Sequence, residues 1–201
     1  MAVTPKQFEQ MQRRLGAKRA AAPVFEGSLR APSVGGQIII GVDPSVRGTG
    51  YGVIQSGKPH PRALAHGTIR CPAGWERSRC LANISRTLRE MVAKYHPGVC
   101  AMEGLFYAQN LQTALLMGEA RGAALAVMGE AGLEIYEIAP RKIKQAIVGH
   151  GAAQKLAVGK MVQRLLHLTA LPEPDAADAL AVALAHLHDT GRFILTERKR
   201  L

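Results

Sequence analysis

The sequence has few cysteines and no long apolar run. Its three cysteines, Cys71, Cys80 and Cys100, are an odd number without the spacing of metal ligands, so we expect neither a disulfide framework nor a cysteine-bound metal. No window reaches about 18 consecutive apolar residues, which excludes a membrane-spanning helix. No apolar signal-peptide core follows Met1, and we therefore expect a cytoplasmic protein without a membrane partner.

Acidic residues are scarce relative to basic ones. The 201 residues include 26 Lys or Arg and 15 Asp or Glu, which gives a formal net charge of +11 and a pI of about 10.1. This balance favours a polyanionic partner, with nucleic acid ahead of an acidic membrane surface. The apolar fraction of 47% excludes a chain that is disordered throughout, and the length suits one domain with a hydrophobic core.

Composition divides the chain into three parts. Residues 1–36 hold six Lys or Arg and two Glu without apolar periodicity, and we expect a flexible basic extension. A transit-like peptide is the alternative, although its two glutamates and scarce serines count against it. Residues 37–190 are expected to fold as one domain, and residues 191–201 to form a basic tail.

Hydrophobic patterns predict an α/β fold. Strands are expected over 37–43, 50–57, 63–71, 99–104 and 133–139. Helices are expected over 76–95, 109–130 and 153–168, from Pro140 onward, and from Pro174 to about His188. A meander of three strands followed by strands that alternate with helices is typical of a mixed five-stranded sheet flanked by helices.

Four carboxylates are placed where such a fold would bring them together. Asp43 ends the first strand and Glu103 ends the fourth, and ligands in these sheets bind beyond strand ends where the topology changes. Asp175 and Asp178 are spaced i, i+3, so they share one face of the opening turn of the last helix. We therefore expect the four acids to line one cleft.

Clustered acids of this kind repel one another, and divalent cations resolve the conflict. Mg²⁺ prefers oxygen ligands, and two such ions about 3.5–4 Å apart can activate a water and stabilise the leaving oxygen of a phosphodiester. The pattern thus favours a metal-dependent nuclease. Taken singly, each acid has another interpretation: Asp43 as a turn residue before Pro44, Asp175 as a favourable charge at a helix start, and Glu103 as one partner of a buried ion pair.

Five motifs in order carry a family resemblance. They are "GVDPSVRGTGYGVI", "AMEGLFYAQN", "ALLMGEARGAAL", "APRKIKQAIVGHGAAQK" and "DAADALAVALAH". Over about residues 37–188 the chain resembles the RuvC family of Holliday junction resolvases, which have an RNase H-like fold. The resemblance implies that Asp43, Glu103, Asp175 and Asp178 are the catalytic and metal-binding acids. Ser45 stands where the family often has glycine, which puts the geometry of this turn in question.

The resemblance also implies a reaction and its partners. A homodimer would make paired, symmetric cuts in four-way junction DNA during recombination and repair. Each active site would use two Mg²⁺ ions, for which Mn²⁺ can substitute, and RuvA and RuvB would be further partners.

Five residues are expected to contact DNA. The resemblance points to Lys144 and Lys155 as phosphate contacts, and to Phe106, with Tyr107 in the same role, as a stacking partner for an unpaired base. Arg47 lies in the glycine-rich turn beside Asp43, where it would either reach a phosphate or pair with an acid. Small residues along 109–130 would seat this helix on the sheet or form the dimer contact.

Three other functions are compatible with parts of this pattern. An actin-like kinase or ATPase also begins with an aspartate and a glycine-rich hairpin, but it needs a second such hairpin, which the sequence does not contain. An RNase H-fold nuclease could act on another branched DNA or on structured RNA. A junction-binding protein without cleavage is the third alternative, and the four acids argue against it.

Overall fold

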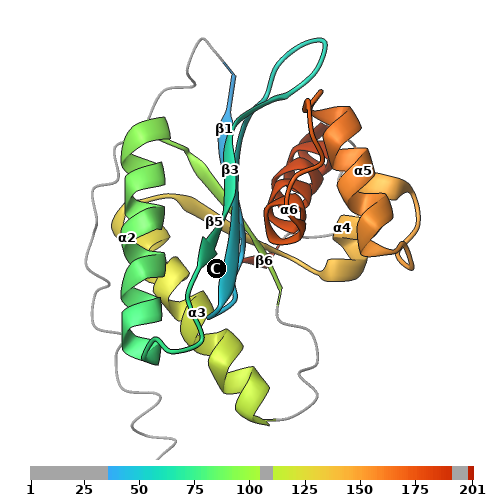
Figure 1. Cartoon of the computed structure of the whole chain (residues 1–201). Helices are drawn as coiled ribbons and strands as arrows, with labels where there is room; N and C mark the ends of the chain where they lie inside the picture. The colour runs from blue at the N-terminus through green and yellow to red at the C-terminus, as the bar shows by residue number, and fades with distance from the viewer. Residues whose placement is uncertain (1–35, 105–110, 192–198) are drawn as a thin grey trace, which may run out of the picture.

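The computed structural model describes residues 36–104, 111–191 and 199–201, which form one mixed sheet with helices on both faces (Figure 1). The strands are β1 (Ile38–Asp43), β2 (Gly48–Gln55), β3 (Arg62–Arg70), β4 (Val99–Glu103), β5 (Glu134–Ile138) and β6 (Lys199–Arg200), in the spatial order β3-β2-β1-β4-β5-β6. β1, β2 and β3 are antiparallel neighbours, whereas β1, β4 and β5 run parallel. β1 therefore joins the meander to the parallel half.

The predicted mixed five-stranded sheet is confirmed in β1 to β5. β6 extends it by a two-residue strand, antiparallel to β5, within the segment expected to be only a basic tail. The Leu201 amide continues this pairing by donating to the Ile135 carbonyl oxygen at 3.0 Å. The predicted extension over 1–36 lies, apart from residue 36, outside the described residues.

The helices begin and end close to the predicted positions. They are α2 (Arg77–Tyr95), α3 (Leu111–Glu130), α4 (Pro140–Val148), α5 (Lys155–Leu165) and α6 (Pro174–Gly191). Pro140 occupies the first turn of α4, where its missing amide hydrogen costs no hydrogen bond. The left-handed residue His96 ends α2, directly after the last residue of the helix predicted over 76–95. Within the described parts of the chain, none of the helices has the length and apolar character needed to span a membrane.

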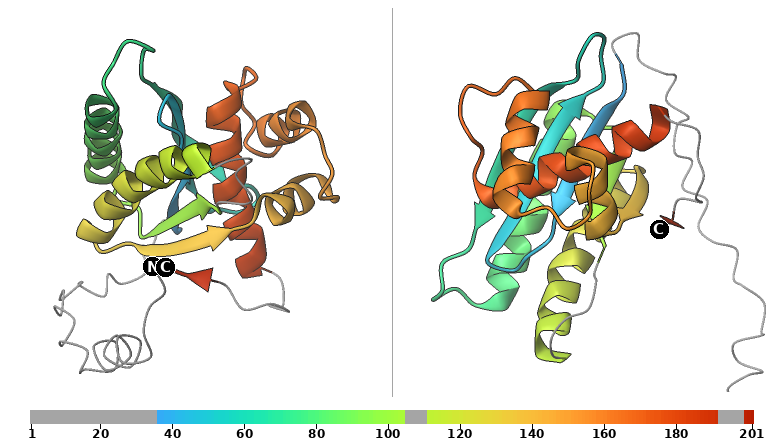
Figure 2. Two further views of the ribbon diagram at one scale, coloured as in Figure 1. Left: turned by 90° about the horizontal axis from the view of Figure 1, so that it is seen from below. Right: turned by 90° about the vertical axis from the view of Figure 1, so that its right-hand side faces the viewer.

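The sheet separates two hydrophobic cores. α2 and α3 cover one face, and α4, α5 and α6 cover the other (Figures 1 and 2). Because successive strand residues point to opposite faces, Ile39 packs with Leu180 and Leu184 on the α6 side, whereas Ile40 packs with Leu88 on the α2 side. Two acids of the predicted site, Asp43 and Glu103, are at strand ends between these cores.

The backbone of α6 lies directly on β1 and β2. A Cβ atom added to Gly41 would be 2.0 Å from the Ala179 carbonyl oxygen, and one added to Gly50 would be 1.9 Å from the Asp175 carbonyl oxygen. No side chain fits in either space, so these glycines are required by close approach. The same approach brings the first turns of α6, which carry Asp175 and Asp178, to the edge of the sheet.

We expect Gly50→Ala to destabilise the fold by about 2–3 kcal/mol or more, because the added methyl group can be accommodated only if α6 moves away from β2. Urea unfolding followed by circular dichroism measures the change. The matched control is Gly129→Ala, since nothing lies within 4 Å of the corresponding Cβ in α3. That control should stabilise the protein by about 0.5–1 kcal/mol. Equal stability of the two variants would contradict the close-approach interpretation.

Candidate active site

Asp43 and Glu103 meet at the carboxyl ends of two parallel strands. Asp43 is the last residue of β1 and Glu103 the last of β4, and the two strands are in register through Val42 and Met102. Their side chains are joined by a hydrogen bond. The strand topology thus brings together two acids that are distant in sequence.

The other two acids reach this pair from α6. Asp175 and Asp178 lie in the first two turns of the helix and are half-buried. The charges of both aspartates act on Asp43, and the charge of Asp178 also acts on Glu103. The four predicted carboxylates therefore interact electrostatically, although only Glu103 and Asp178 line the pocket described below.

Burial raises the pKa of both strand-end acids. The pKa of Asp43 is raised chiefly by desolvation, and also by the charges of Asp178 and Asp175. The pKa of Glu103 rises to about 8, first because of desolvation and then because of the charge of Asp43. At neutral pH Glu103 is thus the protonated partner, and it donates its hydrogen bond to ionised Asp43.

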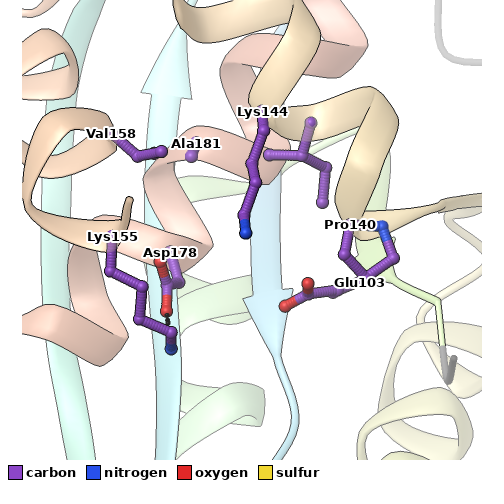
Figure 3. A pocket seen from close by; sticks show the side chains of 8 residues that line it. Glu103, Pro140, Lys144, Lys155, Val158, Asp178 and Ala181 are labelled. Atoms are coloured by element: carbon purple, nitrogen blue, oxygen red, sulfur yellow. Dashed lines mark hydrogen bonds and ion pairs between the residues drawn. The ribbon is translucent and has the colours of Figure 1, made fainter. Parts of the chain in front are cut away.

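Two lysines face the same cluster. Lys155, the first residue of α5, places its Nζ atom 2.7 Å from Oδ2 of Asp178, and this hydrogen bond is the main cause of its raised pKa. Lys144 projects from α4 (Figure 3). With Glu103 and Asp178 the two lysines line a pocket of about 220 Å³, whose remaining walls are Pro140, Ile143, Val158 and Ala181.

Two contacts reduce the repulsion among these acids. Lys155 offsets Asp178, and a shared proton joins Glu103 to Asp43. Among the described residues, no three Asp, Glu, His or Cys side chains converge closely enough to hold one metal ion. The donors that line the cluster are carboxylate oxygens, which suit Mg²⁺ or Mn²⁺ better than a thiolate-binding metal.

The turn between β1 and β2 does not need the glycine that Ser45 replaces. The Ser45 amide donates to Oγ1 of Thr49 at 3.2 Å, and the Thr49 hydroxyl donates to the Ser45 carbonyl oxygen at 2.5 Å. Ser45 is not among the described residues with positive φ. A serine thus fits this turn, and the position of Asp43 is unaffected.

The remaining predicted DNA contacts have different outcomes. Arg47 pairs with no acid in the described part of the chain: its Nη1 donates to the carbonyl oxygens of Pro72 at 2.7 Å and Trp75 at 3.0 Å. It thereby holds the loop after β3 beside the β1–β2 turn. Phe106 and Tyr107 lie outside the described residues, so their predicted stacking role stays a prediction.

One charged residue at the site was missed in the sequence. Arg121 in α3 is buried, and its Nη1 donates to the Glu103 carbonyl oxygen at 2.7 Å. A signal was present, because Arg121 shares helical spacing with Ala124 and Met128, which are also buried. An arginine on the apolar side of a helix requires a buried partner.

Comparison with known proteins identifies the family. Residues 39–186 match the family model described as "Crossover junction endodeoxyribonuclease RuvC". The chain belongs to the RuvC family. The matched residues contain all five of the motifs that carried the resemblance.

Relatives and solved structures agree with this membership. RuvC of Akkermansia muciniphila is 44% identical over 163 residues, which cover 80% of this chain and 98% of that protein. RuvC of Alkalilimnicola ehrlichii is 47% identical over 150 residues, covering 75% and 90%. T. thermophilus RuvC in complex with a Holliday junction substrate aligns with a TM-score of 0.75 and 30% identity, covering 82% of this chain and 99% of that one.

The fold is shared more widely than the sequence. The yeast mitochondrial Holliday junction resolvase Ydc2 aligns with a TM-score of 0.55 at 12% identity, over 94% of this chain and 87% of that one. This likeness concerns the fold alone. Together with the RuvC structures it confirms the predicted RNase H-like fold class.

The raised pKa of Glu103 predicts a pH-dependent stability. Between its ordinary pKa of 4.5 and about 8, the folded protein holds a proton that the unfolded chain has released, so the free energy of unfolding should fall as pH rises through this range. In a chelating buffer, Glu103→Gln should reduce the fall between about pH 5 and pH 8 by on the order of 1–3 kcal/mol.

Urea unfolding at each pH measures this effect. The control Glu90→Gln changes an exposed glutamate on α2 and should leave the slope of the wild-type protein unchanged. An identical pH dependence in Glu103→Gln and wild type would show that Glu103 is ionised in the fold.

Proposed function

We propose that this chain resolves Holliday junctions by metal-dependent hydrolysis of phosphodiester bonds. The observation that carries the proposal is the gathering of Asp43, Glu103, Asp175 and Asp178 at one sheet edge, in a chain of the RuvC family. The family is one of crossover junction endodeoxyribonucleases, and a solved RuvC structure contains a Holliday junction substrate. Paired symmetric cuts would release two duplexes during recombination and repair.

The four acids would hold two Mg²⁺ ions, with Mn²⁺ as a substitute. When bound, such ions supply a Lewis acid and lower the pKa of an attacking water. For the acids to serve as ligands, Glu103 must release the proton that it shares with Asp43, and Asp178 must exchange Lys155 for the ion as its counter-charge. The apolar wall formed by Ile143, Val158 and Ala181 limits the access of other water to the cluster.

The basic residues beside the cluster would bind the DNA backbone. Lys144 and Lys155 line the pocket, where an ammonium group can neutralise the scissile phosphate or the charge that develops on it. Arg47 is exposed beside the β1–β2 turn. Its guanidinium has five N–H donors, and those on Nε and Nη2 would contact a phosphate. Phe106 and Tyr107 follow β4 in the chain and would stack on an opened base.

A homodimer would supply the second site. On α3, Ala120 and Ala124 are buried against the domain, whereas Leu111 is 76% exposed and Leu115 is 56% exposed. A second copy that covers this apolar end of α3 would form a two-fold dimer with two identical sites, as paired cuts require. RuvA and RuvB, the branch-migration proteins expected from the family resemblance, would be further partners.

We expect symmetric nicks in a labelled synthetic four-way junction with Mg²⁺ and none with EDTA. Asp43→Asn should bind the junction but cut it about 100-fold more slowly or worse, a loss of about 2.7 kcal/mol of transition-state stabilisation. Denaturing gels measure the cleavage rates. The control Glu90→Gln should cut at the wild-type rate.

The choice of substrates separates the alternatives. Duplex DNA, other branched DNA and structured RNA should each be cut far more slowly than the junction. Faster cleavage of any of them would reassign the substrate, and binding without cleavage in wild type would leave only a junction-binding protein. Wild-type activity in Asp43→Asn would reject the assignment of the acids.

The two lysines can be tested separately from the acids. Lys144→Met and Lys155→Met should each lower the cleavage rate, and each should reduce the slope of log affinity against log salt by about 1, because each removes one phosphate contact. Fluorescence anisotropy with labelled junction in EDTA measures affinity. Lys94→Met, in the last turn of α2, is the matched control, and an equal change in this variant would contradict specific contacts at the site.

A further inference from the structure

A buried arginine holds the strand end that carries Glu103. Arg121 is only 7% exposed and is the only buried Lys, Arg, Asp or Glu among the described residues. It comes from α3, on the face of the sheet opposite α6 and its two aspartates (Figure 2). It therefore reaches the end of β4 from the face of the sheet opposite the two aspartates.

The guanidinium of Arg121 joins three elements. Nη1 donates to the carbonyl oxygen of Glu103 at 2.7 Å, and Nη2 forms an ion pair with the carboxylate of Glu137 in β5. β5 is the parallel neighbour of β4, and Glu137 is in register with Met102. One planar group thus links α3 to the end of β4 and to the adjacent strand.

A second hydrogen bond holds the same strand end from the other direction. The Gly104 amide donates to the Ile138 carbonyl oxygen at 2.9 Å. The peptide group between Glu103 and Gly104 is therefore fixed on both sides, by Arg121 at its oxygen and by Ile138 at its nitrogen. Residues 105–110, which follow this peptide and precede α3, lie outside the described residues.

Stability alone does not account for this arrangement. Burying an ion pair is often no better for stability than packing two apolar side chains of similar size in its place. What an apolar pair cannot supply is a donor to the Glu103 carbonyl oxygen. The contact that distinguishes Arg121 is thus the one made to the backbone of a proposed catalytic residue.

We propose that Arg121, itself held by Glu137, is a positioning residue that fixes the end of β4 so that the Glu103 carboxyl group stays directed at Asp43. This inference rests on the proposed nuclease function. It assigns no contact with substrate or metal to Arg121, which acts through Glu103.

The test is a double variant, Arg121→Met with Glu137→Leu. It replaces the buried ion pair with apolar side chains, so the melting temperature should stay within a few degrees of wild type. Junction affinity in EDTA should change by less than about threefold, because neither residue lies in the pocket. Single-turnover cleavage at saturating protein should fall about 30-fold or more, since the loss is in positioning.

Two further measurements separate positioning from a general structural role. Arg121→Lys keeps the charge but offers a single donor nitrogen in place of the planar fork, so it should cut more slowly than wild type and faster than the double variant. Hydrogen exchange at the Gly104 amide should accelerate in the double variant while core amides keep their protection. The matched control is Arg89→Met with Glu130→Leu, which removes an exposed ion pair between α2 and α3 and should leave every readout unchanged.

The outcomes are distinguishable. Wild-type cleavage at saturation by the folded double variant overturns the proposal, and so does a loss that appears only in affinity. If the double variant does not fold, Arg121→Lys decides, and a wild-type rate in that variant overturns the proposal. If wild type itself does not cut the junction, the proposed function is rejected, and unchanged exchange at Gly104 in the double variant would then reject the positioning role independently.

Discussion

The close contact between α6 and the first two strands is the constraint on which the site depends. The helix backbone can lie on β1 and β2 only because Gly41 and Gly50 present no side chain to it. If α6 were displaced by the width of a side chain, Asp175 and Asp178 would move away from the strand-end acids. The glycines of the first motif are therefore explained by packing, and the chemistry of the cluster is a consequence of that packing.

The cluster is held together by the fold in spite of its charges. Desolvation and mutual repulsion both favour neutral carboxyl groups. One proton lies between Glu103 and Asp43, and the ammonium group of Lys155 contacts Asp178. Both are groups that a divalent ion can replace. The acids are thus held near one another by these contacts, and in the proposed function a divalent ion would take their place.

Much of this could be predicted from the sequence, because the fold and the acids follow from local patterns. Apolar runs located the five main strands, and the position of Asp43 and Glu103 at strand ends followed from them. β6 was not predicted, since two residues carry no periodicity. The partners of Arg47 are backbone carbonyls 25 and 28 residues away, and those of Arg121, a helix residue, are on the strands β4 and β5. Such contacts depend on tertiary structure and leave no local pattern.

The division of the molecule by its sheet has an evolutionary consequence. The α2–α3 core and the α4–α6 core share strands but not side chains, since alternate residues of each strand belong to one or the other. A lineage can therefore accumulate changes in one core while the other is preserved. Changes on the α2–α3 side should therefore leave the α6 aspartates in place, whereas a change at Arg121 would reach the strand end that carries Glu103.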